Sequence, residues 1–535
     1  MKTVRDPSQG RLFDPFEGVI GPMGRGLIEN GWQSLFREVI LEQMPIQQIS
    51  RDMSSHAGRP SVELHAICGL LLIRDFKGWT VPETHEALLF RADIQYALNL
   101  EPGVELTQRT IERYLARIQQ DETIGEEMFA RVTDSLLRSM EIKVRKQRLD
   151  STHVLSDMSN IGRARMIGLA LKRFFAKVEK YNASLLERFP EELLQRYRKP
   201  SDSQVFGDLG TTEKRHTALQ QAADDLYAVL TGLAEAAPVC DWPSFEQLQL
   251  IFSQQCELRD EFIEVRKKTG GDVIQNSSDP DATYCGNKGP GYQVQISETF
   301  NETGEPNFIT GAVVETAVQS DADAVATVLS DLKERDVLPD EMVADAGYGS
   351  NANVETAKEE GVTLTSPVPG GKQYDPNEVG YDQFEINDAN EVTACPAGHE
   401  PISASYIEST HSLFARMDPS QCAQCPLLDH CHVQRNKKTG VPNGRIQFRI
   451  DAPQSARRRK HEQTEAFRDT YRWRSGIEGT NSCLKRRLGL KRLRVRGFKA
   501  VKTAILLKLA GWNLLRAVAM RAFRNQNTEL AANIA

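Results

Sequence analysis

The chain has 535 residues, of which 40% are hydrophobic and 26% are charged, and its formal net charge is −7. These values are ordinary for a soluble globular protein, and the length allows roughly two to four domains. The first residues, MKTVRDPSQGRLFDPF, lack the apolar segment of a signal peptide, and Lys508 and Arg516 interrupt the apolar run Ala504–Ala519. We therefore expect a cytoplasmic protein with no membrane partner.

Charge and cysteine are unevenly distributed along the chain. From Gly479 to Thr528 there are thirteen Lys or Arg residues and no Asp or Glu, so the negative total does not exclude an anionic partner for this segment. The nine cysteines are an odd number, and most lie far apart in the sequence. This pattern is typical of a reducing compartment, where clustered cysteines act as metal ligands rather than as disulfides.

Residues 1–140 are predicted to be helical. Three segments combine apolar residues at helical spacing with a polar residue that could cap a helix. They are Ser61–Gly78, Thr80–Leu100 and Leu106–Ile118, the last with Thr107 as its cap. Short helices joined by tight turns favour a helix-turn-helix-like domain, with a plain helical bundle as the alternative. In a helix-turn-helix, Arg109, Thr110 and Arg113 would face DNA.

A predicted mixed α/β region follows. Residues 142–155 alternate like a strand with Asp150 near its end, and residues 157–270 form a charged helical insertion. Beyond the insertion the sequence predicts two strands, a helix, a strand, a helix and a strand. These segments are Gly291–Thr299, Asn307–Ala317, Asp321–Arg335, Asp340–Ser350, Asn351–Gly361 and Val362–Val368. The order is compatible with an RNase H-like mixed sheet, in a fold of the α+β or α/β class.

Two acids are predicted at strand ends. Asp150 ends the strand in RLDSTHV, and Asp345 ends the strand in MVADAGYGS. An acid at the carboxyl end of a strand projects into the crevice where α/β sheets bind ligands. The plainer alternative is that each acid forms a turn or caps a helix.

Residues 369–450 are rich in loops and contain a cluster of cysteines. Four thiolates could bind one tetrahedral Zn²⁺ ion and so stabilise a polar segment. The candidate ligands are Cys395, Cys422, Cys425 and Cys431. The histidines that could replace one of them are His399, His430 and His432. An iron–sulfur cluster and free reduced cysteines are the alternatives.

The stretch YRWRSGIEGTNSCLK, Tyr471–Lys485, places one glutamate between two glycines. On a helix, four polar residues fall within a stripe of about 60°. They are Tyr471, Arg474, Glu478 and Lys485, and the opposite side carries Trp473, Ile477, Thr480 and Leu484. Each glycine weakens an exposed helix by roughly 1 kcal/mol, which favours close approach of a metal ion or a nucleic-acid backbone over a merely solvated face.

These residues carry a resemblance to a known family. The spacing Y-x2-R-x3-E-x6-K resembles the YREK signature of bacterial insertion-sequence DDE transposases. RLDSTHV and VADAGYGS are similar to the first and second aspartate motifs of that family, in the same order. Ser61–Ile118 resembles an InsH-type N-terminal transposase domain. The resemblance spans most of the chain but leaves the helical insertion without a counterpart.

The resemblance implies a DNA transposase that cuts element ends and joins them to target DNA. Asp150, Asp345 and Glu478 would hold two Mg²⁺ ions, or Mn²⁺, for phosphoryl transfer. Double-stranded DNA would be contacted near the scissile phosphate by the other signature residues and further along by basic side chains. These are Tyr471, Arg474, Lys485, Arg486, Arg487, Lys491 and Arg492. The family also implies a homodimer or higher assembly on DNA, in the nucleoid-associated bacterial cytoplasm.

The predicted organisation has five parts. They are a helical DNA-binding domain (1–140), an RNase H-like catalytic core (141–156 and 271–368), the helical insertion (157–270), a cysteine-rich, zinc-binding insertion (369–450) and C-terminal catalytic and basic helices (451–525). Two alternatives stay open for the function. One is a metal-dependent RNase H-like nuclease without strand transfer, and the other is a catalytically inactive, transposase-derived DNA-binding protein.

Overall fold

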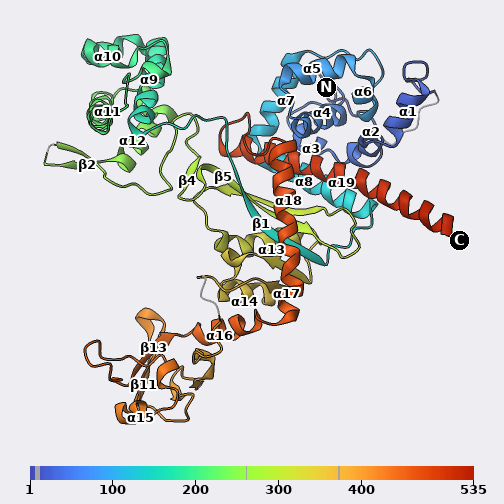
Figure 1. The fold of residues 1–535 in the computed structure, drawn as a ribbon. Helices are drawn as coiled ribbons and strands as arrows, with labels where there is room; N and C mark the ends of the chain where they lie inside the picture. The colour runs from blue at the N-terminus through green and yellow to red at the C-terminus, as the bar shows by residue number, and fades with distance from the viewer. Residues whose placement is uncertain (7–12, 261, 371–373, 535) are drawn as a thin grey trace.

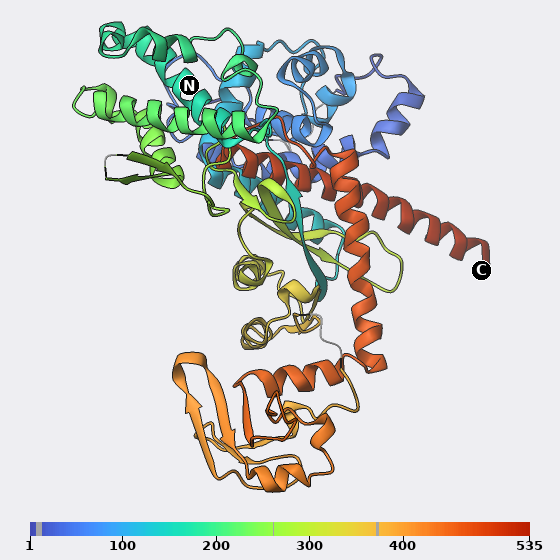
Figure 2. The same ribbon diagram turned by 60° about the vertical axis from the view of Figure 1, so that its left-hand side comes forward.

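A computed structural model describes residues 1–6, 13–260, 262–370 and 374–534, the last six of these by their backbone alone. A mixed sheet lies at the centre of the molecule, with the N-terminal helices packed beside it (Figures 1 and 2). The helical insertion and the cysteine-rich region extend away from the sheet in different directions. A column of helices, α17 and α18, runs from the cysteine-rich region back to the centre.

The N-terminal region is helical, as predicted. Its helices are α1 (Pro22–Glu29), α2 (Trp32–Leu35), η1 (Phe36–Ile40), η2 (Leu41–Gln43), α3 (Ile46–Ile49), α4 (Leu64–Lys77), α5 (Val81–Phe90), α6 (Ala92–Ala97), α7 (Gln108–Gln120) and α8 (Glu122–Ser139). Thr80 and Glu83 form a capping box at the start of α5. Glu63 rather than Ser61 caps α4. Thr107 is the N-cap residue of α7, but its hydroxyl bonds the hydroxyl of Thr110 and not the backbone.

The central sheet is mixed. Its strands are β1 (Lys146–Val154), β4 (Thr283–Cys285), β5 (Gly289–Thr299), β6 (Ile309–Thr316), β7 (Glu341–Ala344) and β8 (Thr363–Thr365). The order is β6-β5-β1-β7-β8, and β4 also pairs with β5. β5 runs antiparallel to β1, β4 and β6, whereas β7 runs parallel to β1 and β8. The mixed α/β class is therefore confirmed.

Two helices connect the strands in the predicted order. α13 (Ala324–Glu334) follows β6 after the short helix η6 (Asp321–Asp323), and α14 (Asn351–Glu359) lies between β7 and β8 after η7 (Ala346–Tyr348). Parallel strands need a connection long enough to return to the same end of the sheet. The two helical connections are long enough, so β7 and β8 can join the sheet in parallel.

One large core joins the N-terminal helices, the sheet and the last helix, α19 (Phe498–Ile534). α19 packs on α8 and α4. Within the described residues, α19 is the one helix with a part long and apolar enough to cross a membrane, Phe498–Thr528. However, 78% of the apolar 18-residue stretch in this part is buried inside the protein. Its polar residues find backbone partners, since Lys508 Nζ donates to the carbonyl oxygen of Leu488 at 2.6 Å. The burial is that of a core helix.

The helical insertion has a core of its own. Its helices are α9 (Arg163–Asn182), η3 (Ala183–Arg188), α10 (Glu191–Tyr197), η4 (Asp202–Gln204), α11 (Thr212–Gly232), η5 (Val239–Asp241) and α12 (Pro243–Gln255). The sequence did not predict the hairpin that follows them, β2 (Cys256–Arg259) with β3 (Phe262–Val265). The alternation of polar and apolar residues in these two strands is short and weak, so the helical pattern of the rest of the insertion masked it.

The cysteine-rich region contains more strand than the sequence predicts. Its elements are η8 (Tyr381–Gln383), β9 (Glu385–Ile386), β10 (Val392–Ala394), β11 (Ser403–Ile407), η9 (Glu408–Thr410), β12 (Ser412–Arg416), α15 (Pro419–Ala423), η10 (Leu428–His430) and β13 (Arg445–Arg449). The chain then returns to the sheet through α16 (Ala452–His461), α17 (Glu465–Tyr471), η11 (Arg472–Ser475) and α18 (Gly476–Arg487).

Candidate active site

Asp150 and Asp345 lie in adjoining positions where two parallel strands meet. The last paired residues of β1 and β7 are Leu149 and Ala344, so Asp150 is the next residue of β1 and Asp345 is the first residue after β7. Asp345 thus lies at the carboxyl end of β7, one residue beyond its predicted place within the strand, and its carboxylate accepts a hydrogen bond from the Gly347 N–H at 2.8 Å. The prediction that Asp150 ends its strand is wrong. β1 continues past Asp150 because it stays paired with β5 beyond the point where β7 stops.

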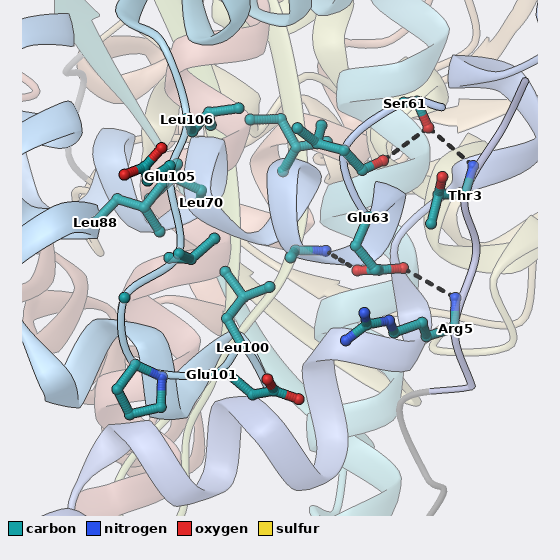
Figure 3. A pocket seen from close by; sticks show the side chains of 16 residues that line it. Thr3, Arg5, Ser61, Glu63, Leu70, Leu88, Leu100, Glu101, Glu105 and Leu106 are labelled. Atoms are coloured by element: carbon teal, nitrogen blue, oxygen red, sulfur yellow. Dashed lines mark hydrogen bonds between the residues drawn. The ribbon is translucent and has the colours of Figure 1, made fainter. Parts of the chain in front are cut away.

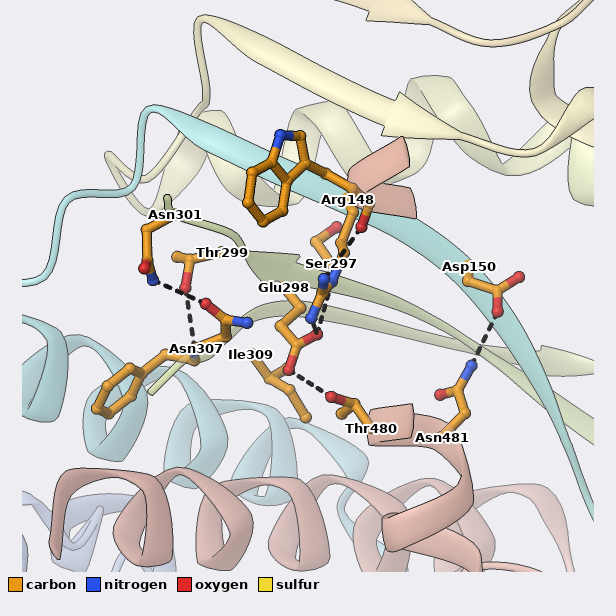
Figure 4. A network of polar contacts seen from close by, with 12 residues as sticks. Arg148, Asp150, Ser297, Glu298, Thr299, Asn301, Asn307, Ile309, Thr480 and Asn481 are labelled. Carbon is orange, nitrogen blue, oxygen red and sulfur yellow. Dashed lines mark hydrogen bonds and ion pairs between the residues drawn. The ribbon is translucent and has the colours of Figure 1, made fainter. Parts of the chain in front are cut away.

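Asp150 is held in an environment that disfavours its charge. Burial raises the pKa of Asp150 to about 6, the positive charge of Arg474 opposes this shift, and the carboxylates of Asp345 and Asp321 add to it. The Asn481 amide donates a hydrogen bond to Asp150 Oδ2 at 2.9 Å (Figure 4). A carboxyl group with so perturbed a pKa, beside a second carboxylate, is typical of a functional site.

Glu478 lies on α18, the helix that crosses next to β1. Its side chain is 60% exposed, and Arg474 Nη1 lies 2.7 Å from Glu478 Oε1 in an ion pair. The division of the helix into two faces is as predicted, because Ile477, Thr480 and Leu484 are buried. The predicted single helix is wrong in one respect, since a 3₁₀ turn, η11, separates α17 from α18.

The other signature residues border the same place. Burial lowers the pKa of Arg474, but the nearby charges of Asp150, Tyr471 and Glu478 outweigh this effect and the pKa is raised. Burial and the neighbouring Lys288 lower the pKa of Lys485, and Asp150 acts against them. Burial raises the pKa of Tyr471, and although the charge of Arg474 opposes this, the carboxylate of Asp345 adds to it. Arg474 and Lys485 therefore lie near enough to Asp150, and Tyr471 to Asp345, for their charges to interact, whereas Glu478 is linked to the site through its ion pair with Arg474.

Among the residues that the structure describes, no group of three or more His, Cys, Asp or Glu side chains is arranged to hold a metal ion. The carboxylates of Asp150, Asp345 and Glu478 are thus not gathered around one point; Asp150 is bonded to Asn481, and Glu478 is paired with Arg474. Their donor type nevertheless suits Mg²⁺, which binds carboxylate oxygens. A cation would also relieve the repulsion between Asp150 and Asp345. In donor type and charge, the residues present fit a divalent cation.

The predicted DNA-binding residues are mostly exposed. Arg486, Arg487 and Lys491 are exposed at and beyond the end of α18. Arg492 is exposed too, although its guanidinium donates to the carbonyl oxygen of Met158 at 3.0 Å. On α7, Arg113 is exposed, and Arg109 is 90% exposed with Glu112 as its ion-pair partner at 3.5 Å. The backbone of the basic segment is fixed beside the end of β1, where the Leu155 N–H donates to the Lys491 carbonyl.

The four candidate zinc ligands line one small cavity of about 30 Å³. They are Cys395, Cys422, Cys425 and Cys431, with His399 beside them. Burial and the other three thiols raise the pKa of Cys422 to about 11. His432 has a different environment, because its ring stacks on Tyr381 with centroids 4.3 Å apart. The thiols line the same cavity, but among the described residues they are not placed closely enough to hold a metal ion.

Sequence reasoning missed several residues of the site. Arg148 and Glu298 form a buried ion pair under α18, and Asn481 bonds Asp150. Arg458, from a basic run, donates to the carbonyl oxygens of Gly349 and Ser366 and so supports the turn after Asp345. The signal that could have revealed Glu298 is its place in the alternation of β5, because it continues the apolar face of Val294 and Ile296, where an acid demands a buried partner.

A larger cavity of about 380 Å³ lies in the N-terminal region, between the first residues of the chain and α4 (Figure 3). Apolar side chains such as Leu70 and Leu88 line it, and acids at its rim include Glu101 and Glu105. Arg5 is also at the rim, and its backbone N–H donates to Glu63. This apolar and acidic lining does not suit a phosphate backbone.

Comparison with known protein families gives a match to the C-terminal part of the chain. A family model described as a Transposase DDE domain matches residues 394–518, a part of the chain that includes Glu478, Lys485 and the four clustered cysteines but neither aspartate. No curated protein and no solved structure matches the chain. The matched domain supports a DDE transposase, with DNA as its substrate and nucleotidyl transfer as its class of chemistry.

Proposed function

We propose that the protein is a DNA transposase of a bacterial insertion sequence, which binds element ends, cleaves DNA and transfers the cut strands. The observation that carries this proposal is the register that sets Asp150 beside Asp345, with Glu478 on the adjoining helix. The matched transposase domain supports it independently. The sheet, with three antiparallel strands followed by two parallel ones, supports the RNase H-like form of the fold.

Asp150, Asp345 and Glu478 would hold the divalent cations. Two such ions, Mg²⁺ or Mn²⁺, supply an activated water or 3′-hydroxyl and stabilise the leaving oxygen of an in-line displacement. Glu478 becomes available when its ion pair with Arg474 opens. The guanidinium of Arg474 can then bind phosphate oxygens, which it matches with two parallel N–H donors. Arg474 thus neutralises carboxylates in the free protein and DNA phosphate in the complex.

The remaining basic residues would hold double-stranded DNA. Lys485 and Tyr471 border the aspartates and would contact the backbone near the scissile phosphate. Arg486, Arg487 and Lys491 would follow the phosphates beyond α18, with Arg492 contributing less because it already bonds a carbonyl oxygen. Arg109 and Arg113 on α7 would contact the element end. Binding of this kind weakens steeply as salt rises. Two or more copies would act together on paired ends, in the nucleoid-associated cytoplasm.

The cysteine-rich region would bind one structural Zn²⁺ ion. Four thiols around one small cavity, with His399 as a further donor, provide the ligand set that such sites use. Burial and the neighbouring thiols raise the pKa of Cys422, and the charge of a bound cation would act against both effects. An iron–sulfur cluster on the same cysteines is the alternative, and metal analysis of the purified protein distinguishes the two.

A strand-transfer assay tests the proposed function. The purified protein is incubated with Mg²⁺, a supercoiled target and labelled DNA that carries the sequences flanking its coding region. We expect cut ends and labelled joined product. Cleavage without joined product would favour the nuclease without strand transfer. Binding without cleavage would favour the inactive DNA-binding protein. The Asp150→Ala variant is the control for a contaminating nuclease, and an exposed acid of the insertion hairpin, changed by Glu264→Ala, is its matched control.

A further inference from the structure

A buried ion pair lies between the sheet and α18. Arg148 of β1 and Glu298 of β5 are direct partners in the antiparallel register. The Arg148 Nε and Nη2 atoms donate to Glu298 Oε2 at 2.9 and 2.7 Å, and the two side chains are 5% and 1% exposed (Figure 4). Removing two charges from water costs free energy, and a pair of apolar side chains would often be equally stable. The pair therefore calls for an explanation other than stability.

The pair bonds the chain on both sides of Glu478. Before it, Arg148 Nη1 donates to the carbonyl oxygen of Trp473 at 3.1 Å. After it, the Thr480 hydroxyl donates to Glu298 Oε1 at 2.7 Å. The remaining polar atoms of the pair are thereby used to fix η11 and α18. A buried ion pair is directional, so it defines a position more sharply than apolar contact does.

One of the glycines that flank Glu478 makes room for this arrangement. A Cβ atom on Gly476 would lie 1.9 Å from Arg148 Nη1, which is far inside van der Waals contact. A Cβ atom on Gly479 would meet no described atom within 4 Å. The two glycines therefore differ in purpose, and only Gly476 is required by the packing of the free protein.

We propose that the Arg148–Glu298 pair is a positioning device that sets Glu478 relative to Asp150. Arg148 and Asp150 lie on the same face of β1, because residues two apart on a strand share a face. The pair fixes the start of α18 to that face, and Asn481 adds a bond from α18 to Asp150. Arg148 and Glu298 touch no substrate and act through the helix. This inference rests on the proposed function, because it takes Asp150 and Glu478 as cation ligands.

Substitution of Arg148 tests the inference against Arg335, a matched arginine whose side chain is 11% exposed. Arg335 also combines an ion pair, to Asp134 at 2.6 Å, with a bond to a backbone carbonyl, that of Thr310 at 2.6 Å. It lies at the end of α13 and makes these bonds to α8 and β6. The variants Arg148→Met and Arg335→Met are compared by hydrogen exchange of the α18 amides and by Mn²⁺ binding measured by electron paramagnetic resonance.

We expect Arg148→Met to weaken Mn²⁺ binding at least tenfold and to speed exchange in α18 at least tenfold. Arg335→Met should change both less than twofold, at a similar loss of thermal stability. Arg148→Lys should restore part of the Mn²⁺ affinity, because it keeps the charge. Equal effects of Arg148→Met and Arg335→Met on the α18 amides would overturn the inference. So would unchanged Mn²⁺ binding in a folded Arg148→Met protein.

The two glycines provide a second test that does not depend on removing a charge. Gly476→Ala should speed exchange in α18 as Arg148→Met does, whereas Gly479→Ala should leave it unchanged or slower. Equal behaviour of the two alanine variants would overturn the inference. If the wild-type protein shows no Mg²⁺-dependent cleavage, the proposed function fails, but the exchange data still decide whether the pair positions α18. If cleavage is present and exchange is unaffected, only this inference fails.

Discussion

The candidate active site and the cysteine-rich region balance their charges in different ways. In the active site, arginines of the same chain neutralise the acids, as Arg474 does for Glu478 and Arg148 does for Glu298. In the cysteine-rich region the four thiols surround one small cavity, and burial with their mutual repulsion raises the pKa of Cys422 to about 11. If the proposed zinc ion is structural, the first region would fold before a cation binds, whereas the second would depend on one.

The two regions also differ in the size of the hydrophobic core that supports them. The active site rests on the large core that joins the sheet to α18 and α19. The cysteine-rich region has a separate core of a few side chains, among them Leu413, Ile446 and Phe448. A small core rarely stabilises a segment alone, and a structural metal ion is a common supplement. The two regions should therefore respond in opposite ways to loss of metal and to changes of charge.

The largest expected effect is the loss of zinc. We predict that Cys422→Ser combined with Cys425→Ser abolishes the bound zinc and unfolds residues 374–450, since structural zinc contributes about 10–16 kcal/mol in zinc-finger peptides. Metal analysis and limited proteolysis measure this. Cys240→Ser, in the helical insertion, is the control. A zinc-free double variant as resistant to protease as the wild type would show that the two regions do not differ in this respect.

The next largest effect concerns catalysis. Asp150→Ala, Asp345→Ala and Glu478→Ala should each reduce the cleavage rate about 10³-fold or more, or about 4 kcal/mol of activation free energy. Each variant should still fold and bind DNA, because arginines rather than a metal ion stabilise the site. Rates are measured on labelled DNA under single-turnover conditions. Rapid cleavage by any one of the three variants would remove that residue from the site.

A third prediction uses the pH dependence of stability. The pKa of Asp150 is raised in the folded protein to about 6, from an ordinary value of 3.8, so folding favours the protonated form. This contribution is complete below about pH 4 and is lost as pH rises through 6. Asp150→Asn should therefore raise the free energy of unfolding by about 1–3 kcal/mol at pH 8 and by little at pH 4. Urea unfolding at both pH values measures it.

The corresponding control is Asp418→Asn in the cysteine-rich region. The side chain of Ser420 and its backbone N–H donate to Asp418, and they lower its pKa. That variant should therefore not become more stable at pH 8. An equal gain for Asp150→Asn at both pH values would mean that the gain comes from packing and not from charge.

The smallest expected effect is electrostatic. Changing Arg486, Arg487 or Lys491 to Ala should each reduce the slope of log binding constant against log salt by about 0.9. Arg492→Ala should change the slope less, because Arg492 already bonds the carbonyl oxygen of Met158. Fluorescence anisotropy over a salt series measures the slopes. Lys437→Ala, on the cysteine-rich region, serves as the control. An equal change in its slope would extend the DNA contact to that region.

Local features were predictable from the sequence. The helix–strand order of the sheet region and the helix cap at Thr80 were found from periodicity and residue type, as were the two faces of α18. The features that were predicted wrongly or missed depend on partners that are distant in the sequence. The position of Asp150 within β1 is set by where β5 continues and β7 stops, and neither limit is visible near Asp150. The Arg148–Glu298 pair likewise joins residues that only the register brings together.

The 3₁₀ turn η11 changes how the signature spacing should be understood. A 3₁₀ helix advances about 120° per residue and an α-helix about 100°, so the four residues of η11 add roughly 80° of rotation. Tyr471 and Glu478, which a uniform helix would place about 20° apart, are then separated by roughly 60°. Tyr471 and Glu478 therefore do not share one narrow stripe, because the 3₁₀ turn lies between them. The Y-x2-R-x3-E-x6-K spacing thus sets the directions of its side chains through a change of helix type and not through the period of a single α-helix.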